Sequence, residues 1–128
     1  MKVKQLSVFL ENKVGHLADC IRLLSENNIE INAMTLSDSE EFGIFHFLVE
    51  EPDKAYELLI KNGFGVGETE VMLVHLPDMT KFLDILLSTF KNNKINIEYM
   101  YIGKGGRFVF RIDNLDAAIE AVKNAEFS

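Results

Sequence analysis

The sequence predicts an α+β fold built from two consecutive units with the same order of elements: strand, helix, strand, strand, helix, strand. One observation is that apolar residues alternate with polar ones in several segments, as is typical of strands. Another is that the segments between these strands have apolar residues at helical spacing. The third is an internal repeat. A shift of 66 residues superimposes Val8 on Val74, Leu17 on Leu83, Asn27 on Asn93 and Met34 on Met100. After the following turn the shift becomes 63, which superimposes Gly43 on Gly106, Phe45 on Phe108 and Asp53 on Asp116.

The first unit is predicted over residues 1–68 as an antiparallel sheet with helices on one face. Asn27 and Asn28 end the first helix, because asparagine tolerates the left-handed backbone of a helix stop. Pro52 suits the first turn of the second helix, and Gly63 suits its end. The predicted strands are 2–10, 29–36, 43–49 and a stretch from Phe64 onward, and the predicted helices are 15–26 and one that starts at 52.

The second unit is predicted over residues 69–128, again with helices on one face. No Pro- or Ser-rich linker separates the units, so the last strand of the first unit is expected to continue into the second. The chain ends where the fourth strand of this unit should begin, so we expect most of that edge strand to be missing. The predicted strands are 71–76, 95–102 and 107–112, and the predicted helices are 80–91 and 115–123.

Composition excludes several classes of protein. The net charge of −7 argues against nucleic acid or an anionic membrane as a partner. No apolar run approaches the roughly 20 residues that span a bilayer. The one cysteine, Cys20, rules out an internal disulfide and favours a cytoplasmic location.

The segment from Glu11 to Leu17 joins the first strand to the first helix and contains Gly15. Glycine at such a joint permits close approach of a ligand, and the N–H groups at a helix start attract an anion such as a carboxylate. Asn12 and Gly15 also fit a simple helix cap and a tight turn. Residue chemistry alone leaves both interpretations open.

The order of elements, the duplication and the loop Asn12-Lys13-Val14-Gly15-His16-Leu17 together resemble the ACT domain, whose loop has the pattern Asn-x-Pro-Gly-x-Leu. The segments 27–32 (Asn-Asn-Ile-Glu-Ile-Asn) and 93–98 (Asn-Lys-Ile-Asn-Ile-Glu) resemble that family's approach to its second strand. The resemblance covers essentially the whole chain and implies a tandem pair of ACT units that senses a small molecule.

The resemblance further implies that a ligand, expected to be an amino acid, is held where two units meet in a homodimer. The loop and the second strand of a neighbour would hold it, which implicates Asn12, Val14, Gly15, His16, Leu17, Glu30, Asn32, Ala33 and Met34. A possible second site would use Asp78, Asn96, Glu98, Tyr99 and Met100.

This sequence departs from the family pattern at several positions. Val14 replaces the proline of the loop, and Glu30 replaces a frequent asparagine. The corresponding loop of the second unit, residues 77–83, contains no glycine. We therefore expect the better site in the first unit.

Other candidate chemistries are weaker. His16 and Cys20 lie four residues apart but lack a third metal ligand nearby, so no metal and no cofactor is expected. His46 and His75 have no evident Ser, Cys or Asp partner for nucleophilic catalysis, so no enzyme is expected. Residues 103–106 (Gly-Lys-Gly-Gly) fit a hairpin turn better than a phosphate loop.

The alternation of residues 95–102 predicts one more feature of the second unit. It places Ile95, Ile97, Tyr99 and Tyr101 on one face of a strand, and we expect the two tyrosines either to pack there or to line an interface pocket.

Two functions from different classes remain. The first is a non-catalytic regulatory protein that binds a small molecule, which shifts a population of conformations. The second is a structural or protein-interaction module that has lost its ligand, as the altered loop of the second unit would suggest.

Overall fold

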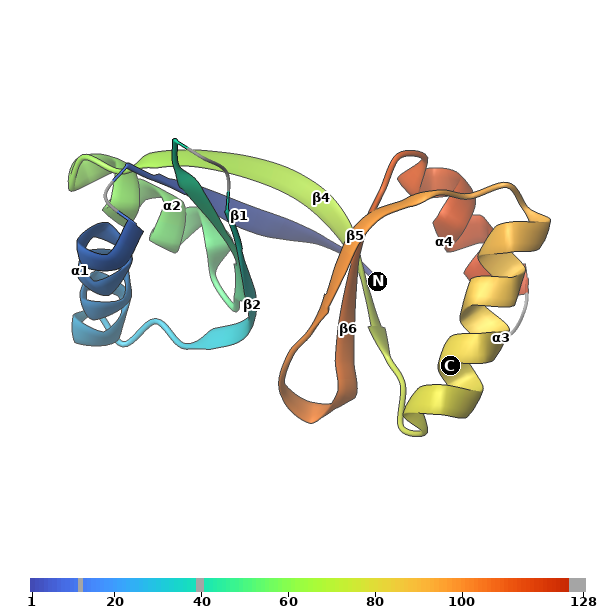
Figure 1. Cartoon of the computed structure of the whole chain (residues 1–128). Helices are drawn as coiled ribbons and strands as arrows, with labels where there is room; N and C mark the ends of the chain where they lie inside the picture. Colours follow the sequence, from blue (N-terminus) through green and yellow to red (C-terminus); the bar gives the residue numbers. More distant parts are fainter. Residues whose placement is uncertain (12, 39–40, 125–128) are drawn as a thin grey trace. The chain divides into compact units, whose positions relative to one another are not determined.

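A computed structural model describes residues 1–11, 13–38 and 41–124 and confirms the predicted α+β order of elements (Figure 1). The first repeat contains β1 (Lys2–Leu10), α1 (Lys13–Glu26), β2 (Ile31–Asp38), β3 (Gly43–Val49), α2 (Pro52–Lys61) and the first part of β4 (Gly65–His75). The second repeat contains the rest of β4, α3 (Met79–Asn92), β5 (Ile97–Ile102), a short 3₁₀ turn (Lys104–Gly106), β6 (Arg107–Ile112) and α4 (Leu115–Asn124).

Contacts divide the chain into two compact units, each described by itself. One is Lys4–Thr69, and the other joins Met1–Val3 to Glu70–Ser128. Two strands, β1 and β4, therefore contribute residues to both units. The uninterrupted β4 confirms the expectation that the last strand of the first repeat continues into the second.

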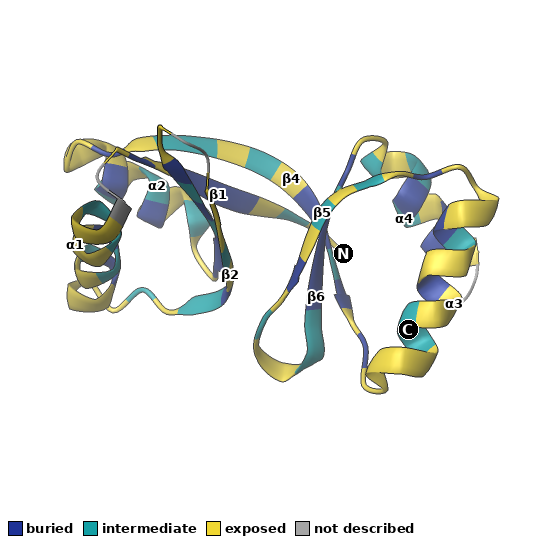
Figure 2. Cartoon of the chain, viewed as in Figure 1, coloured by how far each residue is buried: buried dark blue, intermediate teal, exposed yellow. Residues whose placement is uncertain are grey.

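In the unit Lys4–Thr69, β3 lies between β2 and β1, and β4 follows β1. Both helices cover one face of this sheet, as Figure 1 shows. The core between them contains fully buried side chains from both layers (Figure 2): Leu6, Val8, Leu10, Cys20, Phe45, Phe47, Ala55 and Leu59. Alternate residues of β1 and β3 thus supply the helix-facing half of the core, as expected of a sheet covered on that face.

The second unit has its own core, formed by the helix-facing residues of β4, β6, α3 and α4: Met72, Val74, Leu86, Phe90, Phe108, Phe110, Ala118 and Val122. On one side of β4, Leu73 pairs with Val109 of β6. On its other side, the Leu73 N–H donates to the Met1 carbonyl oxygen at 2.7 Å. Lys2 reinforces this placement, because its Nζ lies 2.9 Å from Asp116 Oδ1. The first residues of the chain therefore lie where the fourth strand of the repeat would pair with β4.

One detail of β5 differs from the prediction. A β-bulge between Ile97 and Tyr99 shifts the register by one residue. A one-residue shift turns all later side chains to the opposite face. Tyr99 and Tyr101 therefore do not share a face with Ile97, and the predicted stripe is wrong. The two tyrosine rings stack on each other with centroids 6.4 Å apart. β2 carries the same bulge, between Ile31 and Ala33.

Helix α1 starts two residues before the predicted Gly15, and β2 starts two residues after the predicted Ile29. The second shift has a local cause. Asn28 adopts a left-handed backbone with φ of 57°, and the Ile29 N–H donates to the Leu24 carbonyl oxygen at 2.9 Å. Ile29 therefore belongs to the helix stop and cannot begin the strand ladder.

Cys20 provides a test of this core. Its side chain is fully buried, and burial raises the pKa of the thiol to about 11. Because the thiolate is the reactive species, a thiol-specific reagent at pH 8 should modify the folded chain far more slowly than the chain in denaturant. The time course of thiol labelling by mass spectrometry measures this. Equal rates in the two states would contradict the packing of α1.

Candidate functional site

The predicted loop site lies at the beginning of α1. Val14 and Gly15 lie in the first turn of α1 and are exposed, Val14 to 84%. Leu17 is half-buried against the core of its unit. Asn12 lies outside the described residues. The accessible part of the loop is therefore the helix start, where backbone N–H groups favour an anion.

His16 turns towards the core of its unit. Its ring stacks on that of Phe64, with centroids 4.7 Å apart and planes inclined by 17°. Phe64 comes directly before β4 and is almost fully buried. The stack fixes the imidazole of His16 beside the first turns of α1.

The four helices differ in the charges at their starts. Asp53 lies in the first turn of α2 and Asp116 in that of α4, while the Asp78 side chain caps α3 by accepting from the Lys81 N–H at 3.3 Å. The first turn of α1 contains no acidic residue. An acidic side chain at a helix start offsets the positive end of the helix dipole. The first turns of α1 and α3 both lack one, and at α3 the capping Asp78 supplies the negative charge instead.

The residues predicted from the second strand have different environments. Asn32 is the bulged residue of β2, and its Nδ2 donates to Glu50 Oε1 at 3.1 Å. Ala33 is buried on the face opposite the helices, so its side chain offers no surface to a ligand. Met34 is on the helix face of this edge strand and is 46% exposed. Glu30 precedes β2 and is exposed.

Within one unit these two groups of residues do not meet. Leu10, which precedes the loop, pairs with Gly43, as does Asp38 at the far end of β2. The start of β2 lies six residues further along β3, where Ile31 pairs with Val49. At about 3.3 Å per residue, the loop and the start of β2 are separated by roughly 20 Å. One unit therefore cannot hold a ligand that touches both segments.

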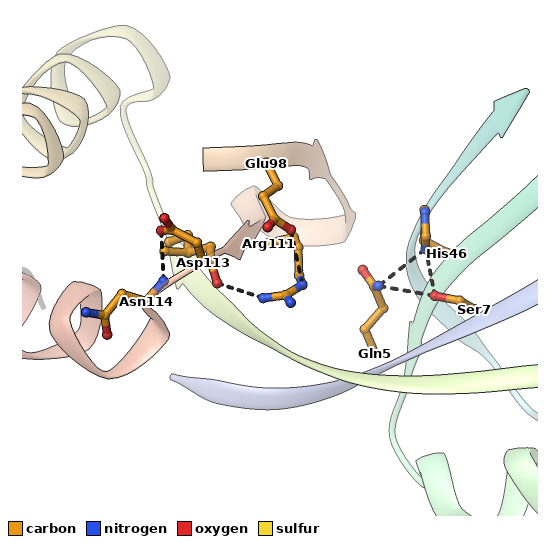
Figure 3. A network of polar contacts seen from close by, with 8 residues as sticks. Gln5, Ser7, His46, Glu98, Arg111, Asp113 and Asn114 are labelled. Atoms are coloured by element: carbon orange, nitrogen blue, oxygen red, sulfur yellow. Dashed lines mark hydrogen bonds and ion pairs between the residues drawn. The ribbon is translucent and has the colours of Figure 1, made fainter. Parts of the chain in front are cut away.

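The second repeat has the same arrangement with different chemistry. Asp78 occupies the helix start, whereas Asn96 and Glu98 lie at the opposite end of their sheet. Glu98 is the bulged residue of β5, and its carboxylate oxygen lies 3.5 Å from Arg111 Nε (Figure 3). Met100 is exposed on the helix face. Because Asp78 caps its own helix, the start of α3 is a poorer place for an outside carboxylate.

Sequence reasoning missed a polar cluster on the face of the first sheet opposite its helices. Ser7 of β1 pairs with His46 of β3, and the Ser7 Oγ lies 2.7 Å from His46 Nδ1 (Figure 3). Gln5 Nε2 lies 3.3 Å from the same ring nitrogen. The expectation that His46 has no serine partner is therefore wrong. The polar residues at alternate positions of β1, Gln5 and Ser7, were the available signal.

This cluster lacks the arrangement of a catalytic triad. With the Gln5 amide nitrogen as the donor, His46 Nδ1 is the acceptor, and a neutral ring in this arrangement would carry its proton on Nε2. Gln5 and Ser7 are both buried, which closes the hydroxyl to a substrate. The contacts satisfy the polar groups of a packed sheet face.

Among residues 1–11, 13–38 and 41–124, no group of three or more His, Cys, Asp or Glu side chains is placed to hold a metal ion. In the same part of the chain, no helix is long and apolar enough to cross a membrane.

Comparison with known families accounts for the duplicated fold and the loop. Residues 1–128 match the family described as the ACT domain pair. The chain belongs to the ACT domain pair family. No curated protein matches the sequence.

Solved structures with the same ACT fold include three that cover nearly all of the chain. Protein BT0572 from Bacteroides thetaiotaomicron is 36% identical, with a TM-score of 0.91, over 98% of this chain and 90% of that one. The ligand-free regulatory subunit of aspartate kinase from Thermus thermophilus is 17% identical, with a TM-score of 0.66, over 96% and 92% of the two chains. The regulatory subunit from Thermus flavus is 16% identical, with a TM-score of 0.57, over 98% and 95%. The last two show similarity of fold alone.

The polar cluster of this ACT pair predicts a pH dependence of stability. Burial lowers the pKa of His46 in the folded state. The unfolded chain, with an ordinary histidine pKa of about 6.5, then binds this proton more readily, so stability should fall as the pH drops below about 6.5.

The measurement is urea unfolding at pH 7.5 and pH 5.0 for the unaltered chain and for His46→Asn. The variant should lose less stability between these two pH values than the unaltered chain. An identical loss in both proteins would show that His46 does not contribute.

Proposed function

We propose that this ACT pair is a non-catalytic regulatory protein that binds an amino acid at the interface of a homodimer. The observation that carries the proposal is the separation of roughly 20 Å between the loop and the start of β2 in one unit, estimated from the strand pairing. Each group of residues is half of a site, and a second copy supplies the other half. The α1 start of one copy would face the start of β2 of the other.

The chemistry of the two halves suits an α-amino acid. The helix start around Val14 and Gly15 would receive the α-carboxylate, favoured by a first turn without an acidic residue. Asn32 donates through its Nδ2 to Glu50, which leaves its carbonyl oxygen to accept from an ammonium group. The ligand side chain would lie near Leu17, His16 of one copy and Met34 of the other.

The edge strand β2 supports association of two copies. Met34 and Leu36 are each 46% exposed on an edge of the sheet that no other described strand covers. Exposed apolar edges are surfaces that a second chain can cover. If β2 pairs with an antiparallel edge strand of a second copy, the start of one strand lies beside the end of the other. This pairing would bring the missing half of the site to the loop.

The second repeat is proposed as a weaker site or none. Asp78 places a carboxylate at the start of α3, where it would repel the carboxylate of a ligand. Glu98, at the position of Asn32, is paired with Arg111. The residues Asp78, Asn96, Glu98, Tyr99 and Met100 are therefore the secondary candidates.

The comparisons support a regulatory role. Two of the similar structures are regulatory subunits of aspartate kinase, and their folds match nearly the whole chain. A cytoplasmic location fits a chain whose one cysteine, Cys20, is buried and unpaired. Binding of an amino acid would stabilise one arrangement of the dimer over another and so shift its population.

The alternative is an interaction module without a ligand. The replacement of the loop glycine by Lys81 in the second repeat favours it, because a module that serves only in assembly can lose such residues. In that case the loop would contribute to association and not to sensing.

A thermal-shift measurement with each of the twenty amino acids at millimolar concentration tests the proposal. A ligand at about 100 times its Kd stabilises a protein by about 2.7 kcal/mol, so at least one amino acid should raise the Tm by several degrees. Gly15→Leu, which adds a side chain at the helix start, should abolish the rise. Ala18→Leu places the same side chain at an exposed position one turn later and should preserve it.

Sedimentation of the same samples separates the two functions. If the Gly15→Leu variant remains dimeric but its Tm no longer rises with the amino acid, the result supports sensing. No response of the unaltered chain to any amino acid would contradict the proposed ligand class. Loss of the dimer in Gly15→Leu, with no amino acid response in the unaltered chain, would favour the interaction module.

A further inference from the structure

A hollow of about 380 Å³ lies at the opposite end of α1 from the loop, between the last turns of the helix and the start of β2. Aliphatic side chains line its floor: Ile21, Leu24, Ile29 and Ile31. Polar groups able to accept hydrogen bonds line the rest: Ser25, Asn28 and Glu30. Its volume falls in the lower range of small-molecule pockets. A ligand for it would have a short aliphatic body and a polar head that donates.

The charge at this helix end is unusual within the chain. The last turns of α2, α3 and α4 contain Lys61, Lys91 and Lys123, whereas that of α1 contains no basic residue. Cations at a helix end offset the negative end of the helix dipole. The last turn of α1 instead contains Glu26, and Glu30 lies beside the hollow. The last turn of α1 therefore contributes no lysine or arginine to offset the helix dipole, and the nearest basic residue of the helix, Arg22, precedes that turn.

The second repeat has basic residues at the corresponding helix end. A shift of 66 residues places Lys91 at the position of Ser25 and Lys94 at that of Asn28. The two backbones match, since Asn28 has φ of 57° and Lys94 has φ of 55°. In both helix stops the next residue donates its N–H five residues back at 2.9 Å, Ile29 to Leu24 and Ile95 to Phe90.

Lysine is an unexpected residue for that backbone. Asparagine visits the left-handed region readily, whereas a lysine there is uncommon and strained. The second repeat nevertheless has a basic residue at this position, which agrees with the general preference for cations at a helix end. The first repeat has the same helix stop, an aliphatic hollow and no lysine.

We propose that the hollow at the end of α1 binds a small aliphatic primary amine. The ammonium group would lie near Glu30, Asn28 and the negative end of α1, where Lys94 lies in the second repeat. The alkyl chain would cover Ile21, Ile29 and Ile31. A free amino acid is disfavoured here, because its carboxylate would meet Glu30 and the helix carbonyl end. The site is thus distinct in position and in charge from the loop that would receive a carboxylate.

Titration of the full chain with three molecules of equal length tests this proposal: pentylamine, pentanol and pentanoate. The readout is the change in ¹H–¹⁵N amide signals at pH 7 and physiological salt. Pentylamine should shift the signals of residues around the hollow, and the neutral alcohol should bind at least about tenfold more weakly because it lacks the charge. The anion should produce no saturable shift at these residues.

Asn28→Lys provides the sharpest variant, because it introduces the lysine that the second repeat has at the same left-handed backbone position. It should raise the Kd for pentylamine at least about tenfold, because the new ammonium group competes for the same place. Asn62→Lys makes the same change at the exposed end of α2 and should change the Kd less than about twofold, since salt screens distant surface charges. Glu30→Gln should also weaken binding.

Three results would overturn the proposal. Equal Kd values for pentylamine and pentanol would show that the hollow binds an alkyl chain without recognising the ammonium group. Equal effects of Asn28→Lys and Asn62→Lys would place the amine elsewhere. Sedimentation measures whether pentylamine dissociates a dimer. Dissociation would show that a side chain of a second copy occupies the hollow. Gly15→Leu should leave pentylamine binding unchanged, so this site and the proposed amino acid site can fail separately.

Discussion

The separation between the loop after β1 and the start of β2 is the constraint on which the functional account depends. It follows from the antiparallel register, in which β1 and β2 each pair with β3 and the two segments meet β3 at opposite ends. No side-chain rotation can close a gap of roughly 20 Å. In the proposed function, the two segments of one sheet therefore belong to two different sites. Dimerisation through a sheet edge is the step that would join them and make ligand binding depend on assembly.

The charged residues at the two ends of helix α1 also bear on ligand binding. Its first turn lacks an acidic residue and its last turn lacks a basic one, whereas the other helices follow the usual pattern at one end or both. A helix end without a compensating charge lacks the stabilisation, of the order of 0.3–1 kcal/mol, that such a charge would add. The buried packing of Cys20 and Leu24 against the sheet is available to offset that cost. An uncompensated helix in this position is suited to receive an anion at one end and a cation at the other.

Much of this fold was predictable from sequence because its signals are local or periodic. The alternation in β1 and β3 and the helix stop at Asn28 all depend on neighbouring residues, and the repeat identified their counterparts. The bulges in β2 and β5 were not predictable, because one extra residue leaves the apolar pattern plausible in either register. The contact of Ser7 with His46 depends on strand register across 39 residues. The hydrogen bond from Leu73 to Met1 likewise depends on contact between segments far apart in the sequence, the first residue of the chain and β4. For the site, sequence and resemblance supplied the candidate residues, and the strand pairing shows that the two groups lie at opposite ends of the sheet.

The most direct test of the account is complementation between two defective copies. Gly15→Leu damages the loop half and Asn32→Ala damages the β2 half, so neither homodimer should bind the amino acid. In a mixed dimer, the intact loop of the Asn32→Ala chain meets the intact β2 of the Gly15→Leu chain. Calorimetry of the exchanged mixture should then recover one site per mixed dimer. Absence of binding in a mixture shown to contain mixed dimers would contradict a site shared between copies.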